Sequence, residues 1–170
     1  TLAVDVQDMF PTGCRVRLKQ SAGTWKYFTV VSSSVDVSDI LTLNLLGGSD
    51  YSVANEAISR MQVSYMSGAQ PGWPGWFNYT PTLTGWSSAP PTYVYKFFPV
   101  GRKITLVIAQ QVNGTSNSTT VSGTLPVAAA SVSGSNLTWL STGLGVDNGS
   151  ALATPIRVDI VSGASQFGCY

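Results

Sequence analysis

The chain has 170 residues and a formal net charge of +1; 44% of its residues are hydrophobic and only 10% are charged. That length can bury a core, and the weak, scattered charge excludes the basic footprint of a nucleic-acid-binding protein. No apolar run approaches the roughly 18 residues that a membrane helix needs. The chain contains no histidine, which removes the Ser-His-Asp triad and the commonest metal ligand. We expect no cofactor, no metal ion, no nucleic-acid partner and no membrane insertion.

Uncharged hydroxyl residues take the place of the usual Lys and Glu. The chain has 22 Ser, 17 Thr and a single glutamate, Glu56, and 11% of its residues are aromatic. Such a composition disfavours helices and favours strands joined by turns. We therefore predict an all-β protein.

The first part of the chain has the pattern of a meander of short strands. Residues 14–19 and 41–45 alternate polar with apolar side chains, and residues 25–31 are aromatic and β-branched. Residues 53–60 hint at a helix of two turns at most. These elements predict a small β-barrel-like or curled-sheet domain over residues 1–67.

A hinge is predicted at residues 68–76. Three glycines and two prolines lie close together here, and neither a strand nor a helix continues through such a composition. Trp73 and Trp76 lie in the same stretch, which indicates a packed hinge and not a loose linker.

Residues 77–170 are predicted to form a β-sandwich of jelly-roll type. Many short β-branched and aromatic runs alternate here with Gly, Pro and Asn turn signals, a pattern typical of sandwiches. The expected strands are residues 92–97, 103–109, 119–125, 137–140 and 155–161.

Several motifs resemble a module of bacteriophage virion proteins, which opens with W-x-x-Y-T-P-T-x-x-G at residues 76–85. The module continues with an aromatic strand, a V-G-R-K turn, a G-T-S-N-x-T-T stretch and an L-P-V ending. In this chain these are Tyr93–Phe98, Val100–Lys103, Gly114–Thr120 and Leu125–Val127. Residues 136–139 and 146–149 resemble later parts of the module, and residues 17–20, 26–28 and 47–51 resemble a small β domain that often precedes it.

The resemblance implies a structural component of a tailed-phage virion. Such modules are externally exposed fibres, spikes or capsid decoration proteins on a tail or head, made in the host cytoplasm and mounted on the particle surface. The resemblance further implies a homo-oligomer, most often a trimer, with other virion proteins as partners. It also implies that further strands follow, so we expect the sandwich to be truncated at its C-terminus.

A cluster of aromatic residues has two possible roles. Large rings fill sheet cores and subunit interfaces, and exposed Trp or Tyr rings also stack against sugars. The second role gives the alternative function, a receptor-binding module for a host cell-surface glycan or protein. The candidate contacts with a glycan or a neighbouring subunit are Trp73, Trp76, Trp86, Tyr79 and Tyr93.

A glycan hydrolase is the least favoured function, and we expect no enzyme activity. Glycosidic cleavage usually needs two carboxylates held roughly 5–10 Å apart. Most of the available aspartates lie in or beside predicted turns, where Asp bonds to backbone amides. The candidate pairs are Asp5 with Asp8, Asp36 with Asp39, Asp50 with Glu56, and Asp147 with Asp159.

Arg15, Arg17 and Lys19 share one face of a predicted strand. The default interpretation is a set of charges that protects a sheet edge from wrong pairing. The same charges could instead meet a capsid or an acidic glycan. Cys14 and Cys169 are expected to be unpaired, partly buried thiols, as in proteins assembled in a reducing cytoplasm.

Overall fold

The protein folds into two compact β units. The first unit comprises Thr1–Tyr79 and Lys96–Val107, and the second comprises Thr80–Tyr95 and Ile108–Tyr170. The structure is a computed structural model that describes residues 6–21, 23–66, 71–89, 93–110, 114–117, 120–131, 138–143, 146–147, 150–151 and 153–170. Apart from one short 3-10 helix, every regular element in these ranges is a strand, as the composition predicts. No helix in the described ranges has the length and hydropathy to span a bilayer.

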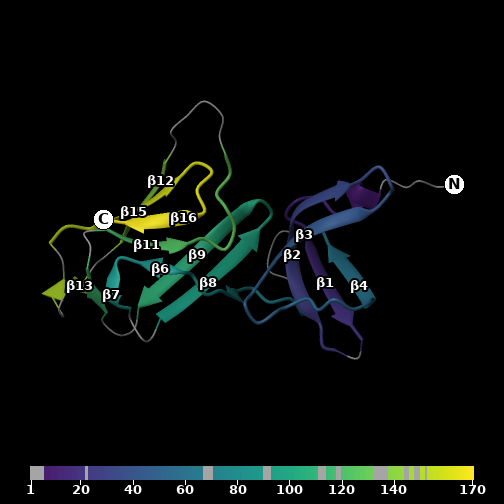
Figure 1. The fold of residues 1–170 in the computed structure, drawn as a ribbon, viewed down its shortest axis with the longest axis horizontal. Coiled ribbons are helices and arrows are strands. Elements are labelled where there is room, and N and C mark those ends of the chain that lie inside the picture. Colours follow the sequence, from purple (N-terminus) through teal and green to yellow (C-terminus); the bar gives the residue numbers. More distant parts are fainter. Residues whose placement is uncertain are drawn as a thin grey trace. The chain divides into compact units, whose positions relative to one another are not determined.

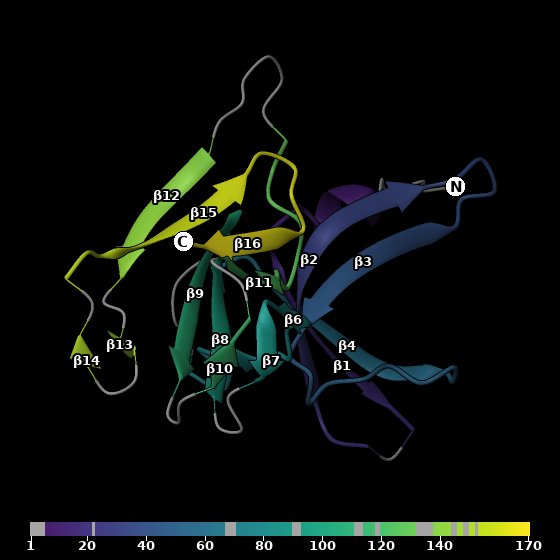
Figure 2. The ribbon, with the colours of Figure 1, turned by 60° about the vertical axis from the view of Figure 1, so that its left-hand side comes forward.

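The first unit contains a four-stranded antiparallel sheet (Figures 1 and 2). The strand order is β3-β2-β1-β4, so β3 and β4 form the two edges. Since these edges do not pair with each other, the sheet stays open and does not close into a barrel. The strands are β1 (Arg15–Gln20), β2 (Lys26–Val35), β3 (Leu41–Gly47) and β4 (Ile58–Ser64), and the short 3-10 helix η1 (Val6–Met9) precedes them.

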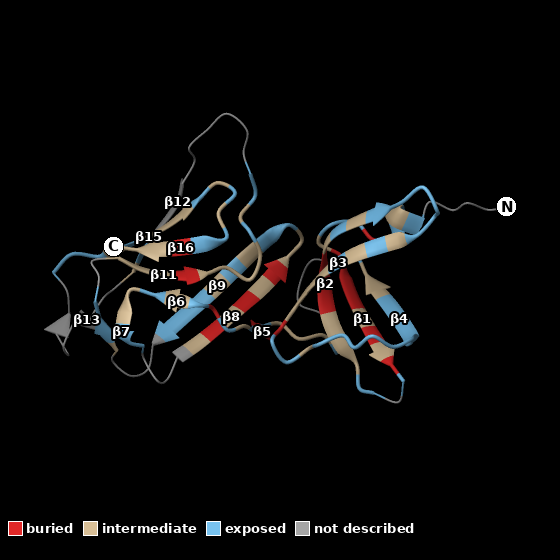
Figure 3. Cartoon of the chain, in the orientation of Figure 1, coloured by how far each residue is buried: buried red, intermediate tan, exposed pale blue. Residues whose placement is uncertain are grey.

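The core of this sheet follows from the alternation along β1. Val16 and Leu18 are 0% and 1% exposed, while the residues between them point to the other face. Val16 lies in one apolar cluster with Phe10, Cys14 and Val30. Leucines of β3 and Val63 of β4 pack around that cluster. The strand is therefore central and buried on one face (Figure 3).

The predicted helix at residues 53–60 is wrong. Residues 51–57 form no regular element, and Ile58–Ser64 form β4, which pairs antiparallel with β1. The register shifts at Ser59, whose hydroxyl donates to the carbonyl oxygens of Lys19 and Ser21. Because of this bulge, Ile58 and Met61 lie opposite Gln20 and Leu18 of β1. The last three residues of the predicted helix are thus the start of a bulged strand.

The interpretation of Arg15, Arg17 and Lys19 as guards of a sheet edge is also wrong. β1 pairs with β2 on one side and with β4 on the other, so it is an inner strand. Arg15 is only 4% exposed. A charge at that position cannot protect an edge, so the row of cations needs another explanation.

A second, smaller sheet carries the aromatic core of the first unit. Phe77 pairs with Phe97 across β5 and β8, and their rings stack with centroids 5.3 Å apart. Tyr79 meets Phe97 edge to face at 6.0 Å. The strands are β5 (Phe77–Asn78), β8 (Tyr93–Val100) and β9 (Lys103–Gln110), in the order β5-β8-β9. β8 and β9 contribute residues to both units.

The second unit is built around a five-stranded antiparallel sheet of order β12-β15-β16-β11-β6. Phe167 of β16, 3% exposed, packs against Gly123 of β11, where a Cβ atom would lie 2.6 Å from its ring. Two small ladders, β10-β7 and β13-β14, accompany this sheet. The strands are β6 (Leu83–Thr84), β7 (Trp86–Ser88), β10 (Thr115–Ser116), β11 (Val121–Thr124), β12 (Thr138–Gly143), β13 (Val146–Asp147), β14 (Ser150–Ala151), β15 (Ile156–Val161) and β16 (Gln166–Cys169).

Candidate functional site

The outer face of β1 forms a basic and aromatic surface. Arg17 is its centre: the guanidinium lies 4.6 Å from the ring centroid of Trp25 and 5.5 Å from that of Trp73. The Nε–H group of Arg17 donates to Oε1 of Gln62 at 2.7 Å. Two cation–π contacts and one hydrogen bond therefore fix the position of this side chain.

Two further cations extend the surface along the sheet. The Lys19 ammonium lies 5.2 Å from the centroid of Trp25, and Lys19 is paired in register with Arg60 of β4. Two like charges in directly opposed positions destabilise a sheet. We define the basic–aromatic face as Arg17, Lys19, Trp25, Tyr27, Arg60, Gln62 and Trp73.

A chain of rings connects this face to the interior of the first unit. The ring of Tyr27 lies 5.4 Å from Trp73 and 5.7 Å from Tyr51, and Tyr51 lies 6.1 Å from Phe77. Burial, with smaller contributions from Asp50 and Tyr27, raises the pKa of Tyr51, so its hydroxyl stays protonated at neutral pH. The aromatic side chains of the face thus pack against rings in the interior of the unit.

The row of cations is buried at its other end. Arg15 lies 5.9 Å from the ring centroid of Phe98, which itself lies 5.5 Å from Trp76. Burial lowers the pKa of Arg15, although a guanidinium remains charged at any physiological pH. Arg15 is therefore a structural cation, while Arg17 and Lys19 are half-buried and Arg60 is exposed.

The five aromatic residues singled out from the sequence do not share one environment. Trp73 joins the basic–aromatic face, Trp76 is 45% exposed beside Phe98, and Tyr79 packs on Phe97. Trp86 lies in the second unit, half-buried, and its indole Nε1 has no hydrogen-bond partner among the described residues. The side chain of Tyr93 lies outside the described residues.

Sequence reasoning missed Trp25, Tyr27 and Arg60 as members of the face. The available signal was the period of two: Trp25, just before β2, and Tyr27, within it, are two residues apart, as Arg17 and Lys19 are in β1. Only the pairing register shows that these two rows meet on one face.

The carboxylates make local structural contacts. Oδ1 of Asp36 accepts hydrogen bonds from the backbone amides of Ser38 and Ile40, which confirms a turn-forming aspartate there. Glu56 accepts a hydrogen bond from Ser21. Asp5 and the side chain of Asp147 lie outside the described residues. Within the described ranges no three His, Cys, Asp or Glu residues gather as a metal site would require.

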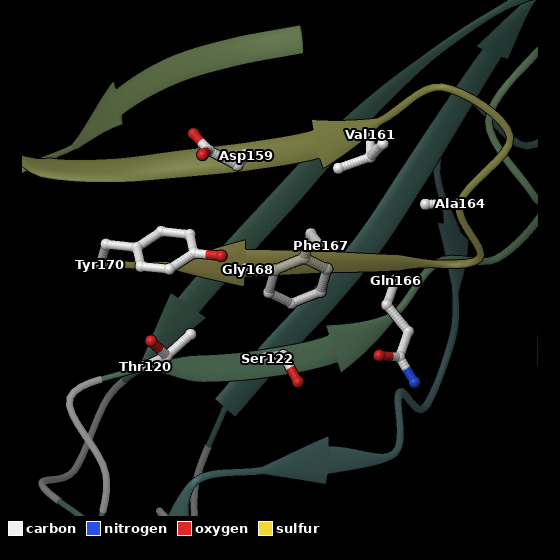
Figure 4. A pocket seen from close by; sticks show the side chains of 9 residues that line it. All are labelled: Thr120, Ser122, Asp159, Val161, Ala164, Gln166, Phe167, Gly168 and Tyr170. Atoms are coloured by element: carbon white, nitrogen blue, oxygen red, sulfur yellow. The ribbon is translucent and has the colours of Figure 1, made fainter. Parts of the chain in front are cut away.

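The second unit has an open depression of about 300 Å³ on its five-stranded sheet (Figure 4). The register places Ser122, Gly168 and Asp159 side by side on neighbouring strands. The ring of Tyr170 lies over Gly168, where a Cβ atom would be 3.2 Å from it. Asp159 is ion-paired with Arg157, which also lies 5.2 Å from the ring centroid of Tyr170. The carboxylate of Asp159 and the ring of Tyr170 therefore both interact with Arg157 already. For this reason the depression is a weaker candidate site than the basic–aromatic face.

Both cysteines are free thiols, Cys14 buried and Cys169 half-buried. Burial raises the pKa of each thiol above the ordinary value of 9.0. The thiolate is the nucleophilic form of cysteine, so neither position has the environment of a reactive cysteine at neutral pH.

This shift predicts an alkaline loss of stability. The unfolded chain releases the Cys14 proton near 9.0, and the folded chain releases it only at higher pH. The free energy of unfolding should be level below that pH and fall as the pH rises through the folded pKa. Urea unfolding between neutral and alkaline pH measures the slope, and Cys14→Ala should reduce it. An unchanged slope in that variant contradicts the prediction.

Comparisons of the chain with protein-family models, with curated proteins and with solved structures found no match. The likeness to phage virion modules therefore rests on the motifs alone. The function has to be argued from the exposed edge, the surfaces and the composition of the chain.

Proposed function

We propose that the chain is a structural module on the outer surface of a tailed-phage virion, a fibre, spike or decoration module that assembles with copies of itself. The observation that carries the assembly is the open edge of the sheet in the first unit. β4 pairs with β1 on one side and, among the described residues, has no strand on the other. Unpaired backbone groups on such an edge are a template for another chain.

Apolar side chains accompany this open edge. Ile58 is 48% exposed and Met61 is 37% exposed, although the register turns both toward the core side of the sheet. Tyr65 and Met66, which follow β4, are 63% and 57% exposed. Figure 3 shows β4 as mostly exposed, in contrast to β1 and to the buried middle of β2. Exposed apolar side chains along an unpaired edge favour burial against a partner surface.

A second copy of the chain is the partner that fits the open β4 edge. The opposite edge of the same sheet, β3, adjoins a turn with exposed Val37 and Ile40. When the β4 edge of one copy meets the β3 edge of the next, the contact is heterologous and closes into a ring if the rotation allows. A ring of three is the form that the resemblance implies.

The composition and the motifs support the position on a virion. Only 10% of residues are charged, and the hydroxyl-rich surface suits a chain that is permanently associated with others. The motifs at residues 76–85 and 114–127 extend the resemblance over both units. In this proposal the antiparallel sheets of the second unit form the expected jelly-roll-like sandwich.

Substitution at the edge tests the assembly. Met61→Lys introduces a charge on the apolar side of β4, so we expect the native mass to fall from three chains of 17.9 kDa to one. Light scattering at equal protein concentrations measures it. The matched control is Val161→Lys, at an exposed valine of the second unit, which should keep the assembled mass. Equal loss of mass in both variants overturns the assignment of β4 as the interface.

The basic–aromatic face favours a second candidate, a receptor-binding module for a host cell-surface glycan. Half-buried rings beside fixed cations are groups that bind sugars carrying negative charge. Changing those residues should then abolish a saturable interaction with host envelope while the native mass stays the same.

A further inference from the structure

We infer that the basic–aromatic face binds an acidic polysaccharide, whose carboxylate or sulfate groups meet Arg17, Lys19 and Arg60 while its sugar rings lie against Trp25 and Trp73. The inference rests on the receptor-binding candidate and does not depend on assembly. It names the ligand class that this face would take.

An uncompensated positive charge is the first argument. Lys19 and Arg60 lie opposite each other on β1 and β4, and Arg17 is the next residue along the same face. The register places no carboxylate on this face of β1, β2 or β4. These three cations make no ion pair with the carboxylates that the structure describes. A bound anion would remove the like-charge repulsion across the ladder.

The side chain of Arg17 is preorganised to bind an anion. Trp25 and Trp73 hold its guanidinium plane, and Gln62 accepts from Nε. Its two terminal nitrogens have no protein partner among the described residues. A guanidinium fork fixed in this way matches the two oxygens of a carboxylate or sulfate and loses little entropy on binding.

The rings around the cations favour a sugar polymer over a nucleic acid. Trp25, Tyr27 and Trp73 are half-buried, so each presents part of a ring beside a charge. Three surface cations and a net charge of +1 provide too little positive charge for a phosphate backbone, which demands a basic stripe. Charges spaced over two neighbouring strands suit a polymer that carries one anion per sugar.

The test uses a polygalacturonate oligomer as the acidic probe and dextran as the neutral one. Binding is followed by the fluorescence of the tryptophans, because two of them form the face. We expect saturable binding of the acidic probe that weakens as salt is added, and none of dextran. Lys19→Gln and Arg60→Gln should each weaken binding about tenfold, as expected for the loss of one charge-assisted hydrogen bond.

Lys103→Gln is the matched control, since it removes an exposed lysine of the same unit from β9. It should change the affinity less than about twofold, because it lies off the face and its charge is screened. Arg60→Gln should leave the thermal stability equal or higher, since it relieves a like-charge pair, whereas Lys19→Gln also loses the contact with Trp25. A merely structural role for Arg60 would lower the thermal stability instead.

Three results would overturn the inference. Dextran could bind as well as the acidic probe, Lys103→Gln could lose as much affinity as Lys19→Gln, or single-stranded DNA of equal charge could bind more tightly than polygalacturonate. The last result would assign the face to nucleic acid. Affinity is measured per chain, so a monomer that binds polygalacturonate refutes the assembly and leaves this inference standing.

Discussion

Replacing Phe97 with alanine is expected to lower the free energy of unfolding by about 3–5 kcal/mol, the range for a buried phenylalanine. Phe97 is 0% exposed and lies between two aromatic neighbours, stacked on Phe77 at 5.3 Å and edge to face with Tyr79 at 6.0 Å. Alanine leaves a cavity that a rigid strand pair fills poorly. Urea unfolding followed by fluorescence measures the loss.

Trp76→Ala serves as the aromatic control for that experiment. Trp76 is 45% exposed and has a single described ring contact, with Phe98 at 5.5 Å. Its loss should cost about 1 kcal/mol, the contribution of one aromatic pair at a partly exposed site. A Phe97→Ala variant no less stable than Trp76→Ala would show that the β5–β8 aromatic pair is not the core of the first unit.

Gly13→Ala is expected to cost at least about 2 kcal/mol of unfolding free energy, because two penalties add at this turn. The backbone of Gly13 has a φ of +91°, which L side chains rarely adopt. A Cβ atom there would lie 2.5 Å from the carbonyl carbon of Gly101, so backbone would have to move. The amide of Gly13 also donates to Val30 at 2.8 Å, which limits that movement.

Gly72→Ala separates the two penalties. Gly72 has a similar φ of +78°, but a Cβ atom there meets nothing within 4 Å. This variant should lose only the conformational term, about 1 kcal/mol. If the two alanine variants are equally stable, the close approach of Gly13 to Gly101 does not exist in solution.

Three of the strands could be predicted from the sequence because local alternation carries the signal. The expected strands at residues 14–19 and 41–45 correspond to β1 and β3, and the run at residues 103–109 to β9. In each, apolar side chains recur at every second position, which is the period of a half-buried strand.

The order of strands could not be predicted, because it depends on contacts between distant segments. β1 pairs with β4, about 40 residues further along the chain, so local patterns do not reveal that β1 is an inner strand. The bulge at Ser59 has the same origin. Its hydroxyl donates to carbonyl oxygens of the β1 segment, about 40 residues earlier in the chain, and local sequence does not reveal that partner.

The candidate site was only partly predictable for a related reason. The crowd of aromatic residues pointed to Trp73, but its contacts are Arg17 and Tyr27, which lie far away in the sequence. Tyr79 belongs to the same crowd and yet packs on Phe97. Neighbours in sequence thus diverge in space, and the register of β1 with β2 and β4 decides which residues share the surface.

The native mass of the unaltered chain shows whether it assembles through the open β4 edge. Light scattering over a hundredfold dilution, with the unfolding temperature measured at each concentration, is the measurement. The account predicts a mass of three chains of 17.9 kDa and an unfolding temperature that rises with concentration, because copies stabilise one another by mass action. A single chain at every concentration, with a constant unfolding temperature, would contradict it.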